Sequence, residues 1–280
     1  MAYRNISVVS RIIIYAIMIL FTVLTVYPVL WVFIQSFRTN VDFMSNSRLA
    51  LPEVWYPGHY SVVWNIWNFP TFFLNSVIYT LATVAGVVLL SNMAGFAFAK
   101  IEFKMTKWLL GLFIIGLLLT LQSILVPLFL MVTNLGLINN RLGVIVPYIA
   151  LGLPIAVYLN TDFIKQGIPN ELLESAKIDG ATLLKIYWKV ILPMSSPVSI
   201  TIAIITFVAT WNEFVLMNIL TTRDANRSIP ALVGRFAGSL GTNWGVLFSI
   251  LSLSLLPILG FYFIFRNKIT QGVSAGALKG

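Results

Sequence analysis

The sequence contains no cysteine and a single histidine, His59, in 280 residues. Without thiols the chain cannot form disulfides, bind metals through thiolates or use a cysteine nucleophile. One imidazole does not make a histidine-based metal site or proton relay, and we interpret His59 as a solvated residue of a polar loop, 38–70. Charge is also scarce, because Asp, Glu, Lys and Arg make up 10% of the chain, against about 25% in soluble domains.

Apolar residues, in contrast, are abundant. The chain is 59% hydrophobic and 14% aromatic, whereas a soluble domain is about 45–50% apolar. This composition predicts an all-α integral membrane protein, with residues 1–280 forming one transmembrane domain. About 20 apolar residues suffice to cross a bilayer, and six segments qualify as predicted transmembrane helices: about 12–36, 71–99, 108–132, 143–163, 198–220 and 244–265.

The net charge of +9 comes from basic residues scattered through short loops. That distribution is typical of loops flanking membrane spans, and we expect no nucleic-acid partner. Six spans place both termini on one side, and the side richer in lysine and arginine is cytoplasmic. We therefore expect cytoplasmic N- and C-termini, because that side holds 12 of the 18 basic residues: Arg4, Arg11, Lys100, Lys104, Lys107, Lys165, Lys177, Lys185, Lys189, Arg266, Lys268 and Lys279.

The longest well-charged stretch is Gly167–Pro193, GIPNELLESAKIDGATLLKIYWKVILP. Pro169 suits the first turn of a helix, where its missing N–H costs nothing. Gly180 interrupts the helical pattern, a second short helix can start at Ala181, and Pro193 is expected to end it. The stretch therefore predicts a polar helix pair, on the cytoplasmic side between the fourth and fifth spans, that binds something outside the membrane.

The spacing within this stretch, E-x-A-x3-G-x9-V-x-L-P from Glu174 to Pro193, resembles the EAA loop of permease subunits in bacterial ABC importers. The family pattern is E-A-A-x3-G-x9-I-x-L-P, so Ser175 and Val190 are its two departures here. The motifs TWNEF at 210–214, NWG at 243–245 and the C-terminal GVSAGALKG resemble the carbohydrate-uptake group, in particular the second permease subunit of maltose-type systems. The alternative interpretation of 167–193 is a generic amphipathic loop.

The resemblance implies an importer subunit in the bacterial inner membrane that forms half of the path for a sugar or oligosaccharide. Its implied partners are a second permease subunit, a cytoplasmic ATPase dimer docked on the 167–193 loop, and an extracytoplasmic solute-binding protein. The sequence has no G-x4-G-K-[ST] loop to cradle ATP phosphates. We therefore expect no cofactor and no covalent chemistry in this chain, with ATP and Mg²⁺ bound by the ATPase partner.

A docking helix needs apolar anchors and a charged rim. Leu172, Leu173, Ala176 and Ile178 are the expected anchors. The resemblance gives Glu174 a contact with a basic group of the ATPase, although its carboxylate could simply stabilise a helix N-terminus; Asp179 could contact the partner or cap the second helix. The predicted coupling residues are Glu171, Leu172, Leu173, Glu174, Ala176, Lys177, Asp179, Gly180, Leu192 and Pro193.

Glu213 is predicted at membrane depth, where carboxylates are rare and usually face a bundle interior or a water-filled path. Trp211 and Asn212 beside it would add an aromatic face and hydrogen bonds for a sugar. Alternatively, Glu213 pairs with an arginine of the next loop or orders the end of the span. Further candidates for the substrate path are Gln122, Asn75 and Asn92.

Three other functions are alternatives for this sequence. One is an importer permease of the same family for amino acids, phosphate or a metal, which the matches at 210–214 and in the C-terminal tail disfavour. An ion-coupled secondary transporter predicts inverted repeats and a midplane ion site, but Glu213 has no evident partner and no repeat is visible. An intramembrane enzyme would need a catalytic constellation, which is missing. The tail 272–280 could reach the ATPase, as in the family, or be a frayed terminus.

Overall fold

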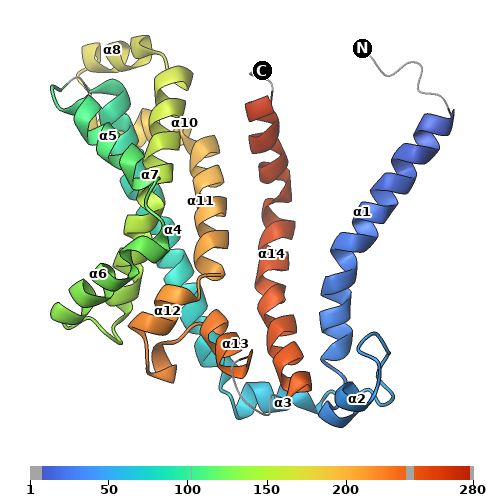
Figure 1. Cartoon of the computed structure of the whole chain (residues 1–280). Helices are drawn as coiled ribbons and strands as arrows, with labels where there is room; N and C mark the ends of the chain where they lie inside the picture. The colour runs from blue at the N-terminus through green and yellow to red at the C-terminus, as the bar shows by residue number, and fades with distance from the viewer. Residues whose placement is uncertain (1–7, 102, 238–242, 278–280) are drawn as a thin grey trace. The chain divides into compact units, whose positions relative to one another are not determined.

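A computed structural model describes residues 8–101, 103–237 and 243–277. Within these ranges every regular element is a helix, which confirms the all-α prediction (Figure 1). The chain divides into two compact units. Unit 1 is Met1–Phe69 with Arg235–Pro257, and unit 2 is Pro70–Gly234 with Ile258–Gly280. Each unit is described by itself.

Unit 1 contains α1 (Val8–Gln35), α2 (Asn40–Ser45), α3 (Gly58–Asn65) and the first part of α14 (Trp244–Ala277). Within this unit α1 packs on α14, where the ring of Trp31 lies edge-on to that of Phe248 at 5.2 Å. The Oγ of Ser249 donates a hydrogen bond to the main-chain oxygen of Ser36. The predicted loop 38–70 therefore contains two helices and is anchored to the start of α14.

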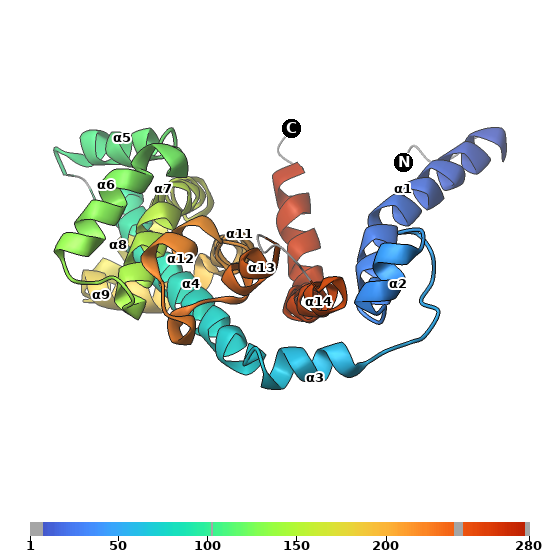
Figure 2. The same ribbon diagram turned by 60° about the horizontal axis from the view of Figure 1, so that its bottom comes forward.

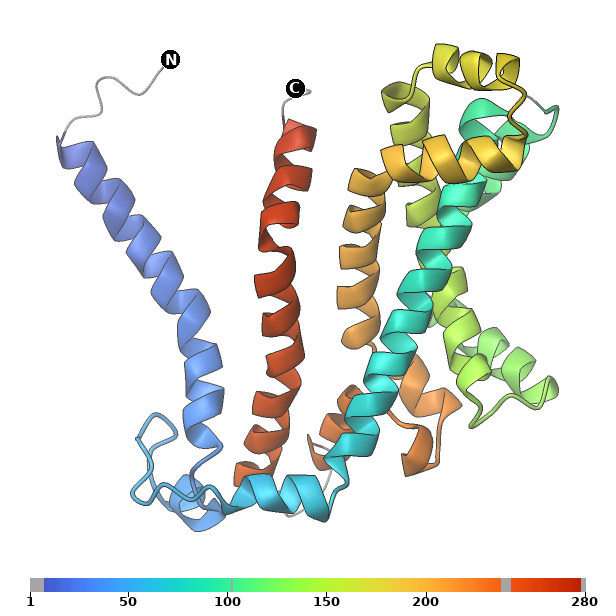
Figure 3. The same ribbon diagram turned by 180° about the vertical axis from the view of Figure 1, so that it is seen from behind.

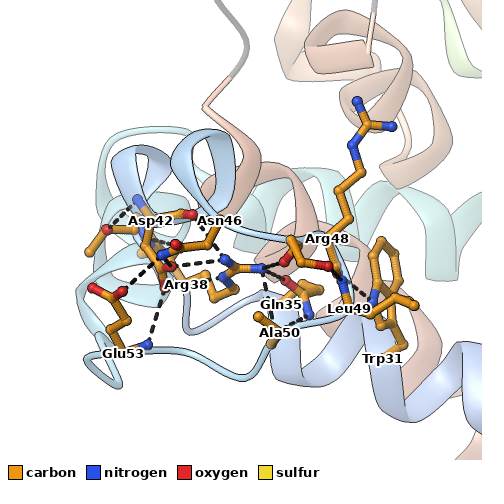
Figure 4. Close-up of polar contacts among 12 residues, drawn as sticks. Trp31, Gln35, Arg38, Asp42, Asn46, Arg48, Leu49, Ala50 and Glu53 are labelled. Atoms are coloured by element: carbon orange, nitrogen blue, oxygen red, sulfur yellow. Dashed lines mark hydrogen bonds and ion pairs between the residues drawn. The ribbon is translucent and has the colours of Figure 1, made fainter.

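A buried arginine organises the turn between α1 and α3 (Figure 4). Arg38 has no exposed surface. Its guanidinium donates to both carboxylate oxygens of Asp42, at 2.8 Å and 3.1 Å. It also donates to the side-chain oxygen of Gln35 and to the main-chain oxygens of Ser47 and Ala50. A single side chain thus satisfies acceptors from α1, α2 and the following loop, which fixes their mutual positions.

The interpretation of His59 as solvated is wrong. His59 lies in α3 and is 6% exposed, with its Nε2 3.1 Å from the main-chain oxygen of Arg38. Burial lowers the pKa of the imidazole, because the charged form loses its hydration. The sequence suggested a loop because α3 is only eight residues long, with Pro57 at its N-cap, and tertiary packing rather than local pattern buries its face.

Unit 2 contains the second part of α14. Apart from Phe69 of α4 and Arg235–Ala237 of α13, which belong to unit 1, it also contains the remaining helices. They are α4 (Phe69–Lys100), α5 (Thr106–Gly116), α6 (Leu121–Asn134), α7 (Arg141–Gly167), α8 (Asn170–Ile178), α9 (Leu183–Ile186), the π-helix η1 (Tyr187–Ile191), α10 (Leu192–Met194), α11 (Ser196–Trp211), α12 (Val215–Leu220), the 3₁₀ turn η2 (Asp224–Asn226) and α13 (Ile229–Ala237).

Within the described ranges, four helices are long and apolar enough to cross a membrane: α1, α4, α7 and α14. Two bent pairs raise the number to six if each pair counts as one span. The first pair, α5 and α6, replaces the continuous helix predicted at 108–132 and is bent by 103° (Figure 2). The second pair, Leu183–Met194 with α11, is bent by 72°.

Two predicted span ends differ from the structure. The fifth predicted segment, 198–220, is not continuous, because α11 ends at Trp211 and α12 is a separate six-residue helix. The sixth predicted segment ends at residue 265, whereas α14 continues to Ala277. The residues after 265 include Arg266 and Lys268, and polarity marks where a helix would leave a membrane rather than where its backbone stops.

A polar seam joins the long helices of unit 2. The amide of Asn92 in α4 donates to the Oγ of Ser199 in α11 at 2.9 Å. The amide of Asn160 in α7 donates to the Oγ of Ser91 in α4 at 2.8 Å. All but Ser199 are fully buried. Hydrogen bonds between helices hold membrane bundles together where apolar contacts alone give little preference.

Candidate functional site

The stretch 167–193 forms the predicted helix pair. α8 begins directly after Pro169, which is its N-cap residue rather than part of its first turn. Gly180 ends the helix with φ at +75°, a left-handed conformation that glycine adopts without steric cost. Its N–H donates to the main-chain oxygen of Lys177. The second helix begins at Leu183, where the hydroxyl of Thr182 accepts from the N–H of Lys185, rather than at Ala181.

Pro193 does not end the second helix as predicted. The chain stays helical from Leu183 to Met194, and the bend falls at Ser195. The turns just before Pro193 widen into the π-helix η1, where the N–H of Leu192 donates to Tyr187, five residues back. Proline lacks an N–H and its ring clashes with the preceding turn of a regular α-helix, and we attribute the wider turn to that constraint.

Leu173 fixes α8 to the rest of unit 2. It is 5% exposed, and it belongs to a buried cluster whose other members come from the ends of α4 and α7 and from α9 and η1: Phe96, Ile164, Ile168, Ile186, Tyr187 and Ile191. Ala176 and Leu192 pack against the same cluster. These three predicted coupling residues therefore pack against other parts of this chain rather than facing outward. Because the cluster joins α8 to α4 and α7, we expect these helices to move together.

Other residues of α8, unlike Leu173, are exposed. Leu172 is 40% exposed and Ile178 is 87% exposed. Glu171, Asp179, Gly180 and Pro193 are exposed as well. Glu174 and Lys177 are exposed too, and they line a cavity on the flank of α8 that also touches α5 and α7. The apolar anchors free to meet another protein are thus Leu172 and Ile178, with acidic residues at each end of the face.

The alternative role of Glu213, ordering the end of its span, fits the structure. Its carboxylate accepts the N–H groups of Leu216 and Met217 at 2.8 Å and 3.2 Å, at the start of α12. It also accepts the hydroxyl of Tyr148 at 2.6 Å. Tyr148, in α7, was not singled out from the sequence, although a hydroxyl inside a span needs a partner. Glu213 therefore connects α7 to the break between α11 and α12.

Three other substrate-path candidates are buried. Asn75 donates to the main-chain oxygens of Ala225 and Arg227, Asn92 lies in the polar seam, and Trp211 stacks on Phe207 at 5.7 Å between ring centres. Asn212 and Gln122 are exposed. Glu213 is half-buried, so Asn212 and Gln122 are the most exposed of the six candidates.

The motif NWG at 243–245 has a packing role in unit 1. The side-chain oxygen of Asn243 accepts from the N–H of Val246 at the start of α14, and the ring of Trp244 lies 5.3 Å from that of Phe43. At Gly245 a Cβ would lie 2.3 Å from the Nε2 of His59. Only glycine allows this approach, so the motif fixes α14 against α2 and α3.

Among the described residues, no three His, Asp or Glu side chains are placed to hold a metal ion.

These features define a multi-span membrane protein with an exposed polar helix anchored to its bundle. Residues 91–274 match the family described as "Binding-protein-dependent transport system inner membrane component". That match covers more than half of the chain, which therefore belongs to this family of ABC transporter permease subunits, and the family indicated by the sequence is confirmed. The family is one of permease subunits rather than enzymes, and its description places it in the inner membrane.

Similar proteins match nearly the whole chain. A putative ABC transporter permease protein, ORF2 of Caldicellulosiruptor sp. (strain Rt8B.4), is 34% identical over 92% of this chain and 94% of that protein. The trehalose/maltose transport system permease protein MalG of Thermococcus litoralis is 31% identical over 98% and 99%. A chain from the crystal structure of a bacterial ABC transporter that imports the acidic polysaccharide alginate has a TM-score of 0.78 at 22% identity, covering 94% of this chain and 99% of that one, and it supports the fold.

Proposed function

We propose that this chain is one of two permease subunits of an ATP-driven importer for a sugar or oligosaccharide. Support for a sugar comes from the relative named for trehalose and maltose transport and from the motifs at 210–214 and 243–245. A binding protein on the outer side would deliver the solute. ATP and Mg²⁺ would be held by a separate ATPase dimer, since this sequence has no phosphate-binding loop of its own.

The observation that carries the proposal is the exposed face of α8 on a helix that is anchored through Leu173. Leu172 and Ile178 are both exposed on α8, and apolar side chains inserted into a partner's pocket usually supply most of the binding energy of an interface. The buried cluster joins α8 to α4 and α7. Closure of two ATPase subunits would therefore move the membrane helices with the docked loop, which is the requirement for coupling.

Both termini would lie on the same side of the membrane as α8, the cytoplasmic side. The excess of basic residues on the loops at 100–107 and 165–197 supports a cytoplasmic position for α8. For the solute path we propose Asn212 and Gln122, because both are exposed and polar. The other four candidates would not contact the solute but would hold the helices around the path in place: Glu213, Asn75, Asn92 and Trp211.

Docking is tested by co-purification of the ATPase with Ile178→Asp. A charge at the most exposed anchor should abolish co-purification, because burying an unpaired carboxylate is costly. Leu135→Asp is the matched control, since Leu135 is 64% exposed on the turn between α6 and α7, at the opposite end of α7 from α8 (Figure 3). ATPase retained by Ile178→Asp as in the control would contradict docking through α8.

Transport is tested in vesicles that contain this chain with its second permease subunit, the ATPase and the binding protein. Uptake of labelled maltose or trehalose should require all components and ATP. Uptake driven by an ion gradient in vesicles containing this chain alone would overturn the importer proposal. ATP-dependent uptake of another solute, with no uptake of sugars, would support an importer of the same family with a non-sugar substrate.

A further inference from the structure

A cavity of about 1280 Å³ lies within unit 2, lined by the end of α4, the start of α5, the second half of α7 and one flank of α8. Figures 1 and 3 show these segments together at one end of the unit. On α8 the lining residues are Asn170, Leu173, Glu174 and Lys177, whose spacing of three and four places them on one face. This face is different from the one that exposes Leu172.

The lining is strongly basic. Among the residues that the structure describes, two carboxylates, Asp162 and Glu174, line the cavity with five lysines: Lys100, Lys104, Lys107, Lys165 and Lys177. These described groups sum to three positive charges. Clusters of lysine at the membrane surface attract phosphate-bearing lipids, and basic pockets between transmembrane helices hold their headgroups.

The lysines differ in what they already bind. Lys100 donates to the main-chain oxygen of Ile168 at 2.6 Å and to the side-chain oxygen of Asn170 at 2.7 Å, so it forms part of the wall. In the described ranges, the other four lysines make no ion pair with a carboxylate. Asp162 accepts a hydrogen bond from Gln166 in the same helix. Four ammonium groups are thus available to an anion.

The other half of the lining is apolar. Phe98, Leu110 and Tyr158 line the cavity, and each belongs to a helix with the length or composition of a membrane span. Just beyond the cavity, α5 exposes Trp108 at 79% and Leu112 at 64%. Trp and Tyr are typical of the membrane–water interface. The cavity therefore extends from charged loop residues to residues at membrane depth.

We propose that this cavity binds one anionic phospholipid from the leaflet next to α8, with the phosphodiester headgroup between the lysines and an acyl chain along Phe98, Leu110 and Tyr158. A soluble acidic partner would match the lysines only, and would leave the apolar lining unfilled. A lipid matches both halves. Because α8 forms one wall, the lipid contacts the coupling helix directly, on a face different from the one that exposes Leu172.

The test is native mass spectrometry of the full-length chain with phosphatidylglycerol, phosphatidylethanolamine or inorganic phosphate. The wild type should retain one phosphatidylglycerol in preference to phosphatidylethanolamine, and excess inorganic phosphate should not displace it. Lys104→Gln with Lys165→Gln should lower retention at least about tenfold, since each lysine near an anionic lipid contributes about fivefold in affinity. Single variants should each show a partial loss.

The matched control is Lys185→Gln with Lys189→Gln, which removes the same charge from exposed positions that do not line the cavity. Equal lipid loss in the two double variants would overturn the site. Displacement by inorganic phosphate would show an anion site without a lipid. Loss of ATPase co-purification with unchanged lipid retention would assign the lysines to the soluble partner. Each readout is independent of transport, so the result stands apart from the proposed function.

Discussion

Arg38 is fully buried and its charge is balanced by one carboxylate, that of Asp42. Removing one partner of a buried pair leaves the other charge without compensation, at a cost of about 3–5 kcal/mol. Arg38→Met should therefore lower the unfolding temperature of the chain in detergent. Arg48→Met is the control, because Arg48 is exposed and its side chain points away from the network (Figure 4). Equal melting of the two variants would contradict a structural role for the pair.

The same pair predicts a pH dependence. The hydrogen bond from Arg38 holds the pKa of Asp42 well below its usual range. A carboxyl group whose pKa is lower in the folded than in the unfolded state stabilises the fold above its unfolded pKa, about 3.9, and loses this contribution as the pH falls further. Between about pH 6 and about pH 3, the unfolding temperature should fall more steeply in the wild type than in Asp42→Asn. Parallel curves would show that Asp42 does not contribute.

At the scale of elements, the break between α11 and α12 depends on Glu213. In Glu213→Ala the N–H groups of Leu216 and Met217, both in residues about 1% exposed, lose their acceptor. Each buried unsatisfied group costs about 1–3 kcal/mol, so the unfolding temperature should drop clearly. Asn212→Ala next to it should melt like the wild type, because Asn212 is exposed. Loss of sugar uptake by Glu213→Ala with unchanged melting would instead place the carboxylate in the solute path.

The turn between α8 and α9 depends on Gly180. Gly180→Pro cannot adopt the φ of +75° and loses the N–H that closes α8, so α8 should be misplaced and ATP-driven uptake lost. Gly180→Ala is the graded control. Nothing lies within 4 Å of a Cβ placed there, and the strain of the left-handed conformation costs about 1–2 kcal/mol. Full coupling in Gly180→Pro, measured as ATP-dependent uptake in vesicles, would contradict the need for this turn.

Some elements were predictable from the sequence because local rules decide them. Gly180 ends α8 as expected, and apolar runs locate most of α1, α4, α7 and α14. Other features depend on contacts that spacing does not encode. The burial of Leu173 requires α4 and α7 to meet beneath α8, and the burial of His59 requires Gly245 to approach it. The apolar run at 108–132 fits a span equally well whether straight or bent, so composition could not show the break between α5 and α6.

At the scale of the whole molecule, α7 separates two potential surfaces of the membrane. Its 27 residues span about 40 Å at 1.5 Å per residue, which exceeds the hydrocarbon thickness of about 30 Å. The α6–α7 turn lies at one end and α8 at the other (Figure 3). If α5 and α6 together cross the membrane, the turn faces outward and α8 faces the cytoplasm. Lys100, at the end of α4, donates to Ile168 and Asn170 beside α8, so the turn lies at the opposite end of α7 from Lys100.

Thiol labelling tests on which sides of the membrane α8 and the α6–α7 turn lie. The chain has no cysteine, so every introduced thiol is the only one present. Ser175→Cys on α8 and Leu135→Cys on the α6–α7 turn both replace exposed residues. With a membrane-impermeant maleimide, intact cells should label Leu135→Cys but not Ser175→Cys, and inside-out vesicles should show the reverse. Labelling of both from one side would exclude the six-span arrangement. Labelling of Ser175→Cys in intact cells would place α8 outside and rule out docking to a cytoplasmic ATPase.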